Sequence, residues 1–320
     1  MNRKFDVAII GGGIVGLAHA WMAARRGFKV VLLERSRVAE GASVRNFGMI
    51  WPIGQPAGKL YSIALKSREF WLELGLSNVV TVEQCGSIHL AHRQDELSLL
   101  EEFCDKETHG ARMLNVDAVI QRSNLANPDG LLGGMYSETE LRVDPRTASK
   151  RIASWLSSDQ GVECHFSTAV VRIKENCVFA ADGRDWMADR IIVCSGSDLQ
   201  TLYPSLLNAS GLRLCKLQML RSASQADARP LSPHLASGLT LRHYASFESC
   251  RALAALRQRI ASETPELDEF GIHVMASQFP GGEVVLGDSH EYGTKITPFD
   301  STVIDELLLR ELRKVFRPVS

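Results

Sequence analysis

The hydrophobic pattern at the start of the chain predicts a strand, a glycine turn, a helix and a second strand. Residues 7–10 form a continuous apolar run, which is typical of a strand buried on both faces. Apolar residues then recur at helical spacing over residues 14–23, and Gly27 stands where this helix is expected to end. Residues 29–33 form a second apolar strand, which Glu34 follows directly. This order of elements indicates the beginning of an α/β domain.

The rest of the chain alternates between helical and extended patterns. Helices are expected at residues 59–76, 95–107, 251–260 and 302–316, and another is expected to begin at Pro145 with Asp144 as its cap. Strands are expected at residues 79–92, 130–143, 162–173, 191–193, 212–219, 238–247, 271–279 and 283–289. The last two flank a Pro-Gly-Gly turn at residues 280–282. We expect the strands after residue 212 to join residues 85–92 in one mostly antiparallel sheet.

Three glycines, Gly11, Gly13 and Gly16, form the pattern G-x-G-x-x-G where the first strand ends. The first glycine permits a tight turn, the second lets the backbone approach a pyrophosphate, and the third lets helix and strand pack closely. The N–H groups at the helix start favour phosphate, and Glu34 is placed to accept hydrogen bonds from ribose hydroxyls. This element therefore predicts a dinucleotide site. Glu34 favours FAD or NAD over NADP but does not choose between FAD and NAD.

A long loop over residues 36–58 follows this element and shows no regular periodicity. Long loops in compact proteins are commonly functional. This one offers donors, a cation and close-approach glycines through Ser43, Arg45, Asn46 and Gly48, and Arg45 is the strongest individual candidate for a functional cation. The alternative interpretation is an ordinary surface loop.

The composition of the chain adds no new function but argues against several classes of protein. The chain has 320 residues, 45% of them hydrophobic and 23% charged, and a formal net charge of −1, which gives no bias toward nucleic acid or anionic membranes. No signal peptide or membrane span is expected. The seven cysteines are scattered without a C-x-x-C pair, which favours reduced thiols, a cytoplasmic location and no zinc or other metal site.

Six segments of the chain resemble the FAD-dependent amine oxidoreductases of the D-amino-acid oxidase and glycine/sarcosine oxidase superfamily. They read GGGIVGLAHAWMAARRGFKVVLLER, EGASVRNFGMIWPIGQP, RVDPRTA, ADRIIVCSGSDLQTLYP, KLQMLRS and VVLGDSHEYG. The first is shared by many flavoproteins, whereas RNFGMIWP and GDSHEYG are much more specific. The middle segments look most like a subgroup associated with bacterial phosphonate metabolism, and the resemblance extends from Phe5 to about Phe316.

This resemblance implies an α/β chain, α+β overall, in which a Rossmann-like FAD-binding domain carries a second, mostly antiparallel substrate domain. The expected FAD-binding domain comprises residues 1–78, 140–211 and 287–320, and the expected substrate domain comprises residues 79–139 and 212–286. The implied cofactor is FAD, with Gly11, Gly13 and Gly16 at the pyrophosphate and Glu34 on the adenosine ribose. The other implied cofactor contacts are Ile14, Val15, Arg35, Ser43, Arg45, Asn46, Gly48, Val170, Ser195 and Gly196.

The implied reaction is oxidation of the C–N bond of a small amine, with hydride passing from the α-carbon to flavin N5. Amino acids, N-methyl amines and aminoalkylphosphonates are the substrate classes considered, and oxygen or another carrier is the electron acceptor. The catalytic candidates are Arg45, His243 and His290. The substrate-binding candidates are Met49, Lys216, Gln218, Arg242 and Tyr244. If residues 238–247 form a strand, Arg242 and Tyr244 share one face and His243 lies on the other.

Two alternatives belong to other classes. An NAD-dependent dehydrogenase is disfavoured because the sheet-forming insertions interrupt the succession of βαβ units. The second alternative is a truncated or inactive FAD-fold protein. Family members continue beyond the last helix with a glycine-rich turn whose helix start faces the flavin ring, and no such turn follows Asp288 here.

Overall fold

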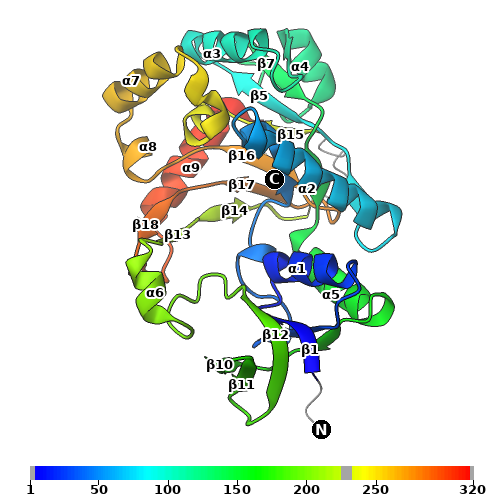
Figure 1. The fold of residues 1–320 in the computed structure, drawn as a ribbon. Helices are drawn as coiled ribbons and strands as arrows, with labels where there is room; N and C mark the ends of the chain where they lie inside the picture. The colour runs from blue at the N-terminus through cyan, green and yellow to red at the C-terminus, as the bar shows by residue number, and fades with distance from the viewer. Residues whose placement is uncertain (1–3, 225–232, 318–320) are drawn as a thin grey trace. The chain divides into compact units, whose positions relative to one another are not determined.

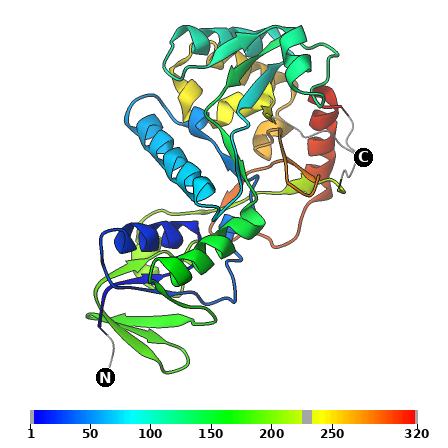
Figure 2. The same cartoon turned by 90° about the vertical axis from the view of Figure 1, so that its right-hand side faces the viewer.

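The computed structural model describes residues 4–224 and 233–317 (Figures 1 and 2). The described chain forms two compact units. The first comprises Met1–Asn46, Gly75–Thr81 and Asp144–Leu212, and the second comprises Phe47–Leu74, Val82–Val143 and Arg213–Ser320. These bounds differ from the expected domains chiefly at residues 47–74 and 287–320, which group with the second unit. The grouping has a physical basis, because β3 pairs with β8 and α9 packs against β17, all within that unit.

The first unit is built around a six-stranded sheet with the order β10-β11-β12-β1-β2-β9. Its strands are β1 (Lys4–Ile10), β2 (Val30–Leu33), β9 (Glu163–His165), β10 (Val170–Lys174), β11 (Cys177–Ala180) and β12 (Asp185–Val193). β1 runs parallel to β2 and β12, and β2 runs parallel to β9, whereas β10 and β11 add an antiparallel extension. The parallel centre confirms the α/β beginning predicted from the apolar runs.

Helices α1 and α5 of the first unit pack side by side (Figure 1). The helical segments of this unit are α1 (Ile14–Ala24), η1 (Ala42–Val44), α5 (Pro145–Asp159) and α6 (Pro204–Ala209). The rings of Trp21 and Trp155 meet edge to face at 5.4 Å between α1 and α5. The predicted start of α5 is confirmed, because Pro145 is its first residue and the Asp144 carboxylate accepts a hydrogen bond from the N–H of Arg146 at 3.0 Å.

The second unit contains a seven-stranded sheet with the order β14-β17-β16-β15-β5-β7-β6. Its strands are β5 (Ser87–Ala91), β6 (Arg112–Leu114), β7 (Gly133–Ser137), β14 (Met219–Arg221), β15 (His234–Ala236), β16 (Met275–Gln278) and β17 (Val284–Gly287). Neighbouring strands pair antiparallel, apart from β15 and β5, which run parallel. The predicted mostly antiparallel sheet is confirmed for residues 87–91 and for the hairpin around residues 280–282, but the strand Leu214–Lys216 pairs in a separate sheet.

Short sheets and helices complete the second unit. The short strands are β3 (Met49–Ile50), β4 (Val82–Glu83) and β8 (Leu141–Val143), which form one sheet, and β13 (Leu214–Lys216) with β18 (Glu291–Gly293), which form another. The helical segments are η2 (Pro52–Gly54), α2 (Lys59–Leu76), α3 (Gln94–Asp105), α4 (Val116–Arg122), η3 (Gly238–His243), η4 (Ala245–Ser249), α7 (Leu253–Glu263), α8 (Glu266–Glu269) and α9 (Thr302–Val315). α2 extends by its last two residues into the first unit. Its bounds are those predicted from its amphipathic pattern.

The strand predicted over residues 238–247 is wrong, because this segment forms the two short helices η3 and η4. Its apolar residues Leu239, Leu241 and Phe247 are buried in the core of the second unit, and that burial explains the apolar pattern without a strand. The alternation that placed Arg242 and Tyr244 on one face therefore does not hold. Within residues 4–224 and 233–317, no helix combines the length and apolar character needed to cross a membrane.

Candidate functional site

The glycine turn of the first unit is closed so tightly that two of its positions admit only glycine. Gly11 has φ +110°, and a Cβ placed there would lie 2.2 Å from the carbonyl oxygen of Cys194. A Cβ at Gly16 would lie 1.9 Å from the carbonyl oxygen of Gly11. The turn therefore brings the start of α1 directly against the ends of β1 and β12, as the spacing of the glycines predicts.

Two side-chain oxygens lie at the N–H groups of this turn. The Ser43 hydroxyl accepts a hydrogen bond from the N–H of Ile14 at 2.9 Å, and the Glu34 carboxylate accepts one from the N–H of Gly12 at 2.5 Å. The first N–H groups of an α-helix have no partner inside the helix and attract anions. Val15, the second residue of α1, is 58% exposed. The N–H groups at the start of α1 thus attract acceptor oxygens, which is the property that a dinucleotide pyrophosphate uses.

The end of β12 is tied to the residue that follows Glu34. The guanidinium of Arg35 forms a 2.8 Å ion pair with Asp198, and the Ser195 hydroxyl donates to the carbonyl of Asp198 at 3.1 Å. Gly196 has φ +61°, a conformation that glycine adopts without strain. The structure therefore brings Arg35, Ser195 and Gly196 together within the first unit.

The remaining cofactor candidates lie in less constrained surroundings. Arg45 ends η1 and is exposed, while the Asn46 side chain donates to the carbonyl of Ala42 at 2.9 Å. Val170 is buried at the first position of β10. Gly48, with φ +68°, belongs to the second unit, where its carbonyl accepts a hydrogen bond from Val143 at 2.9 Å.

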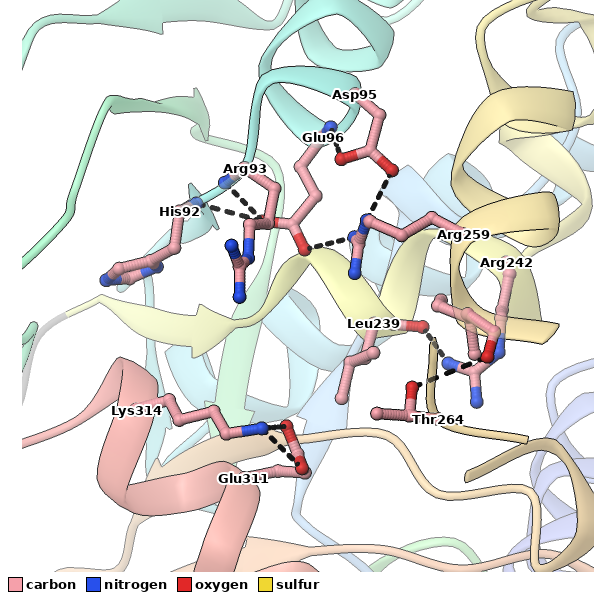
Figure 3. A network of polar contacts seen from close by, with 11 residues as sticks. His92, Arg93, Asp95, Glu96, Leu239, Arg242, Arg259, Thr264, Glu311 and Lys314 are labelled. Atoms are coloured by element: carbon pink, nitrogen blue, oxygen red, sulfur yellow. Dashed lines mark hydrogen bonds and ion pairs between the residues drawn. The ribbon is translucent and has the colours of Figure 1, made fainter. Parts of the chain in front are cut away.

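In the second unit, the Arg242 guanidinium is held by the fold itself. It donates to the Asp268 carboxylate at 2.8 Å and to the carbonyls of Leu239 at 2.6 Å, Leu267 at 3.1 Å and Ile272 at 2.8 Å. Figure 3 shows its contact with Leu239, near the separate network in which Arg259 meets the acidic start of α3. The Arg242 side chain is 6% exposed, so this cation links the loops around α8 and is engaged before any substrate arrives.

Two further substrate candidates also have structural partners. The Lys216 ammonium forms a 3.2 Å ion pair with Asp300. The Gln218 amide donates to the Ser301 carbonyl at 2.9 Å and to the Asp305 carboxylate at 2.7 Å, and its oxygen accepts from the Ser301 N–H at 2.9 Å. These contacts fasten the segment before α9 to β13 and β14.

The last two substrate candidates belong to different elements. Met49 begins β3 and is half-buried. The Tyr244 hydroxyl donates to the sulfur of Met275 at 3.5 Å, and burial raises the pKa of this phenol well above its ordinary value. Its ring lies beside Trp51, with 6.1 Å between the ring centroids. Tyr244 is therefore a neutral group at the edge of the aromatic core.

His243 and His290 come together with two residues that the sequence interpretation missed, and we call the four residues His243, His273, Asp288 and His290 the histidine cluster. His243 stacks on His273 at 4.5 Å, and the ring of His290 meets both edge-on at 5.2 Å and 4.9 Å. The Nε2 atoms of His273 and His290 are 3.3 Å apart. Oδ1 of Asp288 lies in close contact with Nε2 of His273 and 3.8 Å from Nε2 of His290.

The two strands of the hairpin position this cluster. His273 precedes β16, Asp288 follows β17, and the N–H of His273 donates to the carbonyl of Asp288 at 3.0 Å, which extends the pairing of these strands. Burial lowers the pKa of His243 to about 2, helped by the neighbouring His273 and Arg242, and burial likewise lowers the pKa of His290. Both imidazoles are therefore neutral at pH 7.

The fold and the first-unit site together define a class: an α/β dinucleotide-binding chain with a second unit built on an antiparallel sheet. The model of the family DAO, described as FAD dependent oxidoreductase, matches residues 6–319. The chain belongs to this family, whose members depend on FAD.

Relatives with established names support the same placement. The chain is 25% identical over 251 residues to an opine oxidase subunit from Rhizobium meliloti, covering 71% of this chain and 66% of the relative. It is 24% identical over 212 residues to glycine oxidase of Geobacillus kaustophilus, covering 62% of this chain and 56% of the relative. The matched part thus spans less than two thirds of the length of these relatives.

Solved structures share the fold. Glycine oxidase from Bacillus cereus ATCC 14579 superposes with a TM-score of 0.74 at 18% identity, covering 98% of this chain and 78% of that structure. L-α-glycerophosphate oxidase from Mycoplasma pneumoniae, solved with FAD bound, superposes with a TM-score of 0.72 at 18% identity, covering 98% and 79%. At this identity the likeness confirms the mixed α/β fold with several sheets.

Proposed function

We propose that this chain is an FAD-dependent oxidoreductase that oxidises the C–N bond of a small amine. The observation that carries the proposal is the closed glycine turn between Gly11 and Gly16, with the oxygens of Glu34 and Ser43 at its N–H groups. A tight glycine turn at a helix start is what a dinucleotide pyrophosphate needs, the two oxygens show that its N–H groups attract acceptors, and the chain belongs to an FAD-dependent family. The amine is supported by the relatives named opine oxidase and glycine oxidase.

The first unit supplies most of the proposed cofactor contacts. Gly11, Gly13 and Gly16 let the backbone approach the pyrophosphate, and the Glu34 carboxylate accepts hydrogen bonds from the ribose hydroxyls. The remaining proposed contacts are Ile14, Val15, Arg35, Ser43, Arg45, Asn46, Gly48, Val170, Ser195 and Gly196. Family membership favours FAD over NAD, the cofactor of the alternative dehydrogenase interpretation.

When bound, FAD supplies a hydride acceptor at N5 for the carbon next to the amine nitrogen. The amine must lose its proton before this carbon releases hydride readily, and a dry pocket lowers the pKa of an ammonium. Arg45, His243 and His290 are the proposed catalytic candidates. A neutral imidazole such as that of His243 could accept a hydrogen bond from the amine and orient its nitrogen, while the dry surroundings favour the uncharged amine.

An aminoalkylphosphonate is the finer proposal for the substrate, and it requires a cation for the phosphonate. Arg242 and Lys216 already have acidic partners within the second unit. The exposed Arg45 is therefore the residue we propose for the anionic group. Met49 and Tyr244 of the second unit remain the apolar and phenolic substrate candidates. Oxygen or another carrier takes up the electrons. The proposed location is the cytoplasm, which the seven unpaired cysteines support.

The absorption spectrum of the purified protein, with and without added FAD, tests the cofactor. Flavin bands support the proposal, and a colourless protein that takes up no FAD contradicts it. Gly13→Trp would fill the approach to the pyrophosphate, because even an added Cβ would lie 3.0 Å from the Ser43 hydroxyl, and it should abolish flavin retention. Unchanged flavin content in this variant would contradict the placement of the phosphates.

Anaerobic bleaching of the flavin tests the substrate. The panel contains amino acids, N-methyl amines, aminoalkylphosphonates and, as the matched phosphorylated alcohol, glycerol 3-phosphate. The alcohol is included because aerobic glycerol-3-phosphate dehydrogenase of Staphylococcus haemolyticus is 30% identical over 155 residues, covering 45% of this chain and 28% of that relative. Reduction by an amine supports C–N oxidation. Reduction by the alcohol alone, or by no compound, contradicts it.

A further inference from the structure

The histidine cluster contains two residues, His273 and Asp288, to which the proposed amine oxidation gives no role. Three of its side chains, His273, Asp288 and His290, each offer one ligand atom, and these atoms lie within 4.8 Å of one another. Backbone hydrogen bonds position all three residues: the N–H of His273 donates to the carbonyl of Asp288 beside the paired strands β16 and β17, and the N–H of His290 donates to the carbonyl of Phe270 at 3.0 Å. His273 and Asp288 have side chains that are each 4% exposed, and that of His290 is 20% exposed.

We propose that His273 Nε2, Asp288 Oδ1 and His290 Nε2 bind a divalent transition-metal ion of the zinc type. Two pairs of these atoms are 3.3 Å and 3.8 Å apart. Ligands about 2.0–2.1 Å from a tetrahedral Zn²⁺ lie roughly 3.3 Å from each other, so these separations require little movement. The third pair, His273 with Asp288, is closer and opens when a metal ion enters between the two atoms.

The second observation that supports a metal site is a buried carboxylate oxygen without a hydrogen-bond partner in the described part of the chain. Despite its close contact with His273, Asp288 Oδ1 has no hydrogen-bond partner among the described residues, and neither does Nδ1 of His273. The donor is near, but its geometry is not that of a hydrogen bond. A buried carboxylate oxygen without a donor is strongly unfavourable, and a bound cation removes the penalty.

The next layer of side chains orients the ligands. The Tyr292 hydroxyl lies 3.4 Å from Nδ1 of His290, and when Nδ1–H donates to it, Nε2 presents its lone pair toward Asp288. The stacked ring of His243 covers one side of His273. Metal-ligating histidines are commonly fixed in this way by a partner on the second ring nitrogen.

The donor set selects the class of ion. Two imidazoles and one carboxylate suit Zn²⁺, Co²⁺ or Fe²⁺, whereas Mg²⁺ and Ca²⁺ prefer oxygen ligands. An anion is disfavoured at this place because the buried Asp288 carboxylate is itself an anionic group, and the neighbouring Arg242 already pairs with Asp268. The scattered cysteines argue only against a metal site made of thiolates. They do not argue against this site, whose ligands are two histidines and one aspartate from separate segments.

The test uses tag-free, full-length protein stripped with a chelator, and titration calorimetry with Zn²⁺. We expect about one equivalent to bind, and Asp288→Asn or His290→Gln to weaken binding about tenfold or more. The matched control is Glu163→Gln/His165→Gln, which removes an imidazole–carboxylate pair of the first unit with N–O at 2.8 Å. Equal Zn²⁺ binding by wild type and Asp288→Asn, or a loss in the control as large as in Asp288→Asn, would overturn the proposal.

Co²⁺ absorption gives a readout that needs no variant. Visible d–d bands of a low-coordinate Co²⁺ site without sulfur ligation support the proposal, and a thiolate-to-metal band in the near ultraviolet would assign the metal to cysteine and overturn it. Mg²⁺ should produce no saturable heat. These outcomes are independent of flavin content, which is read from the same samples, so the metal site and the proposed oxidoreductase function fail or succeed separately.

Discussion

The carboxylate of Glu34 accepts a hydrogen bond from the backbone N–H of Gly12 at 2.5 Å, so the end of β2 braces the glycine turn after β1. The second carboxylate oxygen accepts from the N–H of Ser36 at 2.8 Å. Hydrogen bonds to charged groups contribute about 1.5–3 kcal/mol. Glu34→Ala is therefore expected to weaken FAD binding about tenfold or more, because the turn loses its brace and the ribose loses its acceptor.

Fluorescence titration of the FAD-free protein measures this effect. Glu40→Ala is the control, because Glu40 is an exposed acid of the following loop. An FAD dissociation constant that is the same in Glu34→Ala and Glu40→Ala would contradict the assigned role.

Gly16→Ala is expected to impair both folding and FAD retention. The added methyl group would lie 1.9 Å from the carbonyl oxygen of Gly11, so α1 must move away from the turn. Overpacking of this kind commonly costs about 1–3 kcal/mol. Gly41→Ala is the matched control, because a Cβ at Gly41 meets nothing within 4 Å. Thermal unfolding and bound-flavin absorbance report both effects, and equal values for the two variants would contradict the close packing of turn and helix.

Local signals were enough to predict most of the fold. The run from β1 to β2, the cap of α5 and the hairpin of β16 and β17 each depend on neighbouring residues, and each was confirmed. Residues 238–247 failed because their apolar side chains are buried by tertiary packing around η3 and η4. An apolar pattern over ten residues does not distinguish a strand from short helices in a core.

The residues of the candidate site were likewise predictable only where neighbouring residues determine their role. The glycine turn is encoded within one segment, whereas the availability of Arg242 depends on Asp268 and on carbonyls of other loops. No single-segment pattern shows such partners. His273 and Asp288 offered a usable signal, because the pairing of Gln278 with Val284 implies that positions near 273 and 288 face each other. The sequence interpretation predicted that hairpin without following its register.

Arg242→Met is expected to destabilise the second unit by about 2 kcal/mol or more, because it leaves buried carbonyl acceptors without a donor. The control Arg257→Met removes a guanidinium that pairs with Glu248 at the surface, where an ion pair contributes at most about 1 kcal/mol. Urea unfolding measures both. A structural Arg242 lowers the unfolding midpoint, whereas a substrate-binding Arg242 would leave the midpoint unchanged and raise KM alone.

His89 makes the stability of the second unit sensitive to acid. The side chain is fully buried against Trp51 and Phe247, and both ring nitrogens have no partner among the described residues. Burial lowers the pKa of His89 to about 3, from an ordinary value of 6.5. At pH 7 both the folded and unfolded states hold a neutral imidazole. As the pH falls below 6.5, His89 binds a proton in the unfolded state, whereas in the folded state it binds one only near pH 3. The free energy of unfolding therefore decreases between these two pH values.

His89→Leu removes this proton uptake and both unpartnered nitrogens. We expect the variant to be at least as stable as the wild type at pH 7.5 and to lose less stability on acidification, by up to about 1.4 kcal/mol per pH unit. Urea unfolding between pH 7.5 and pH 4 measures the difference. Part of the slope remains, because burial also lowers the pKa of His234 to about 3. His19→Gln, which changes an exposed histidine, should follow the wild type. Parallel pH profiles for wild type and His89→Leu would show that His89 is charged, or hydrated, in the folded protein.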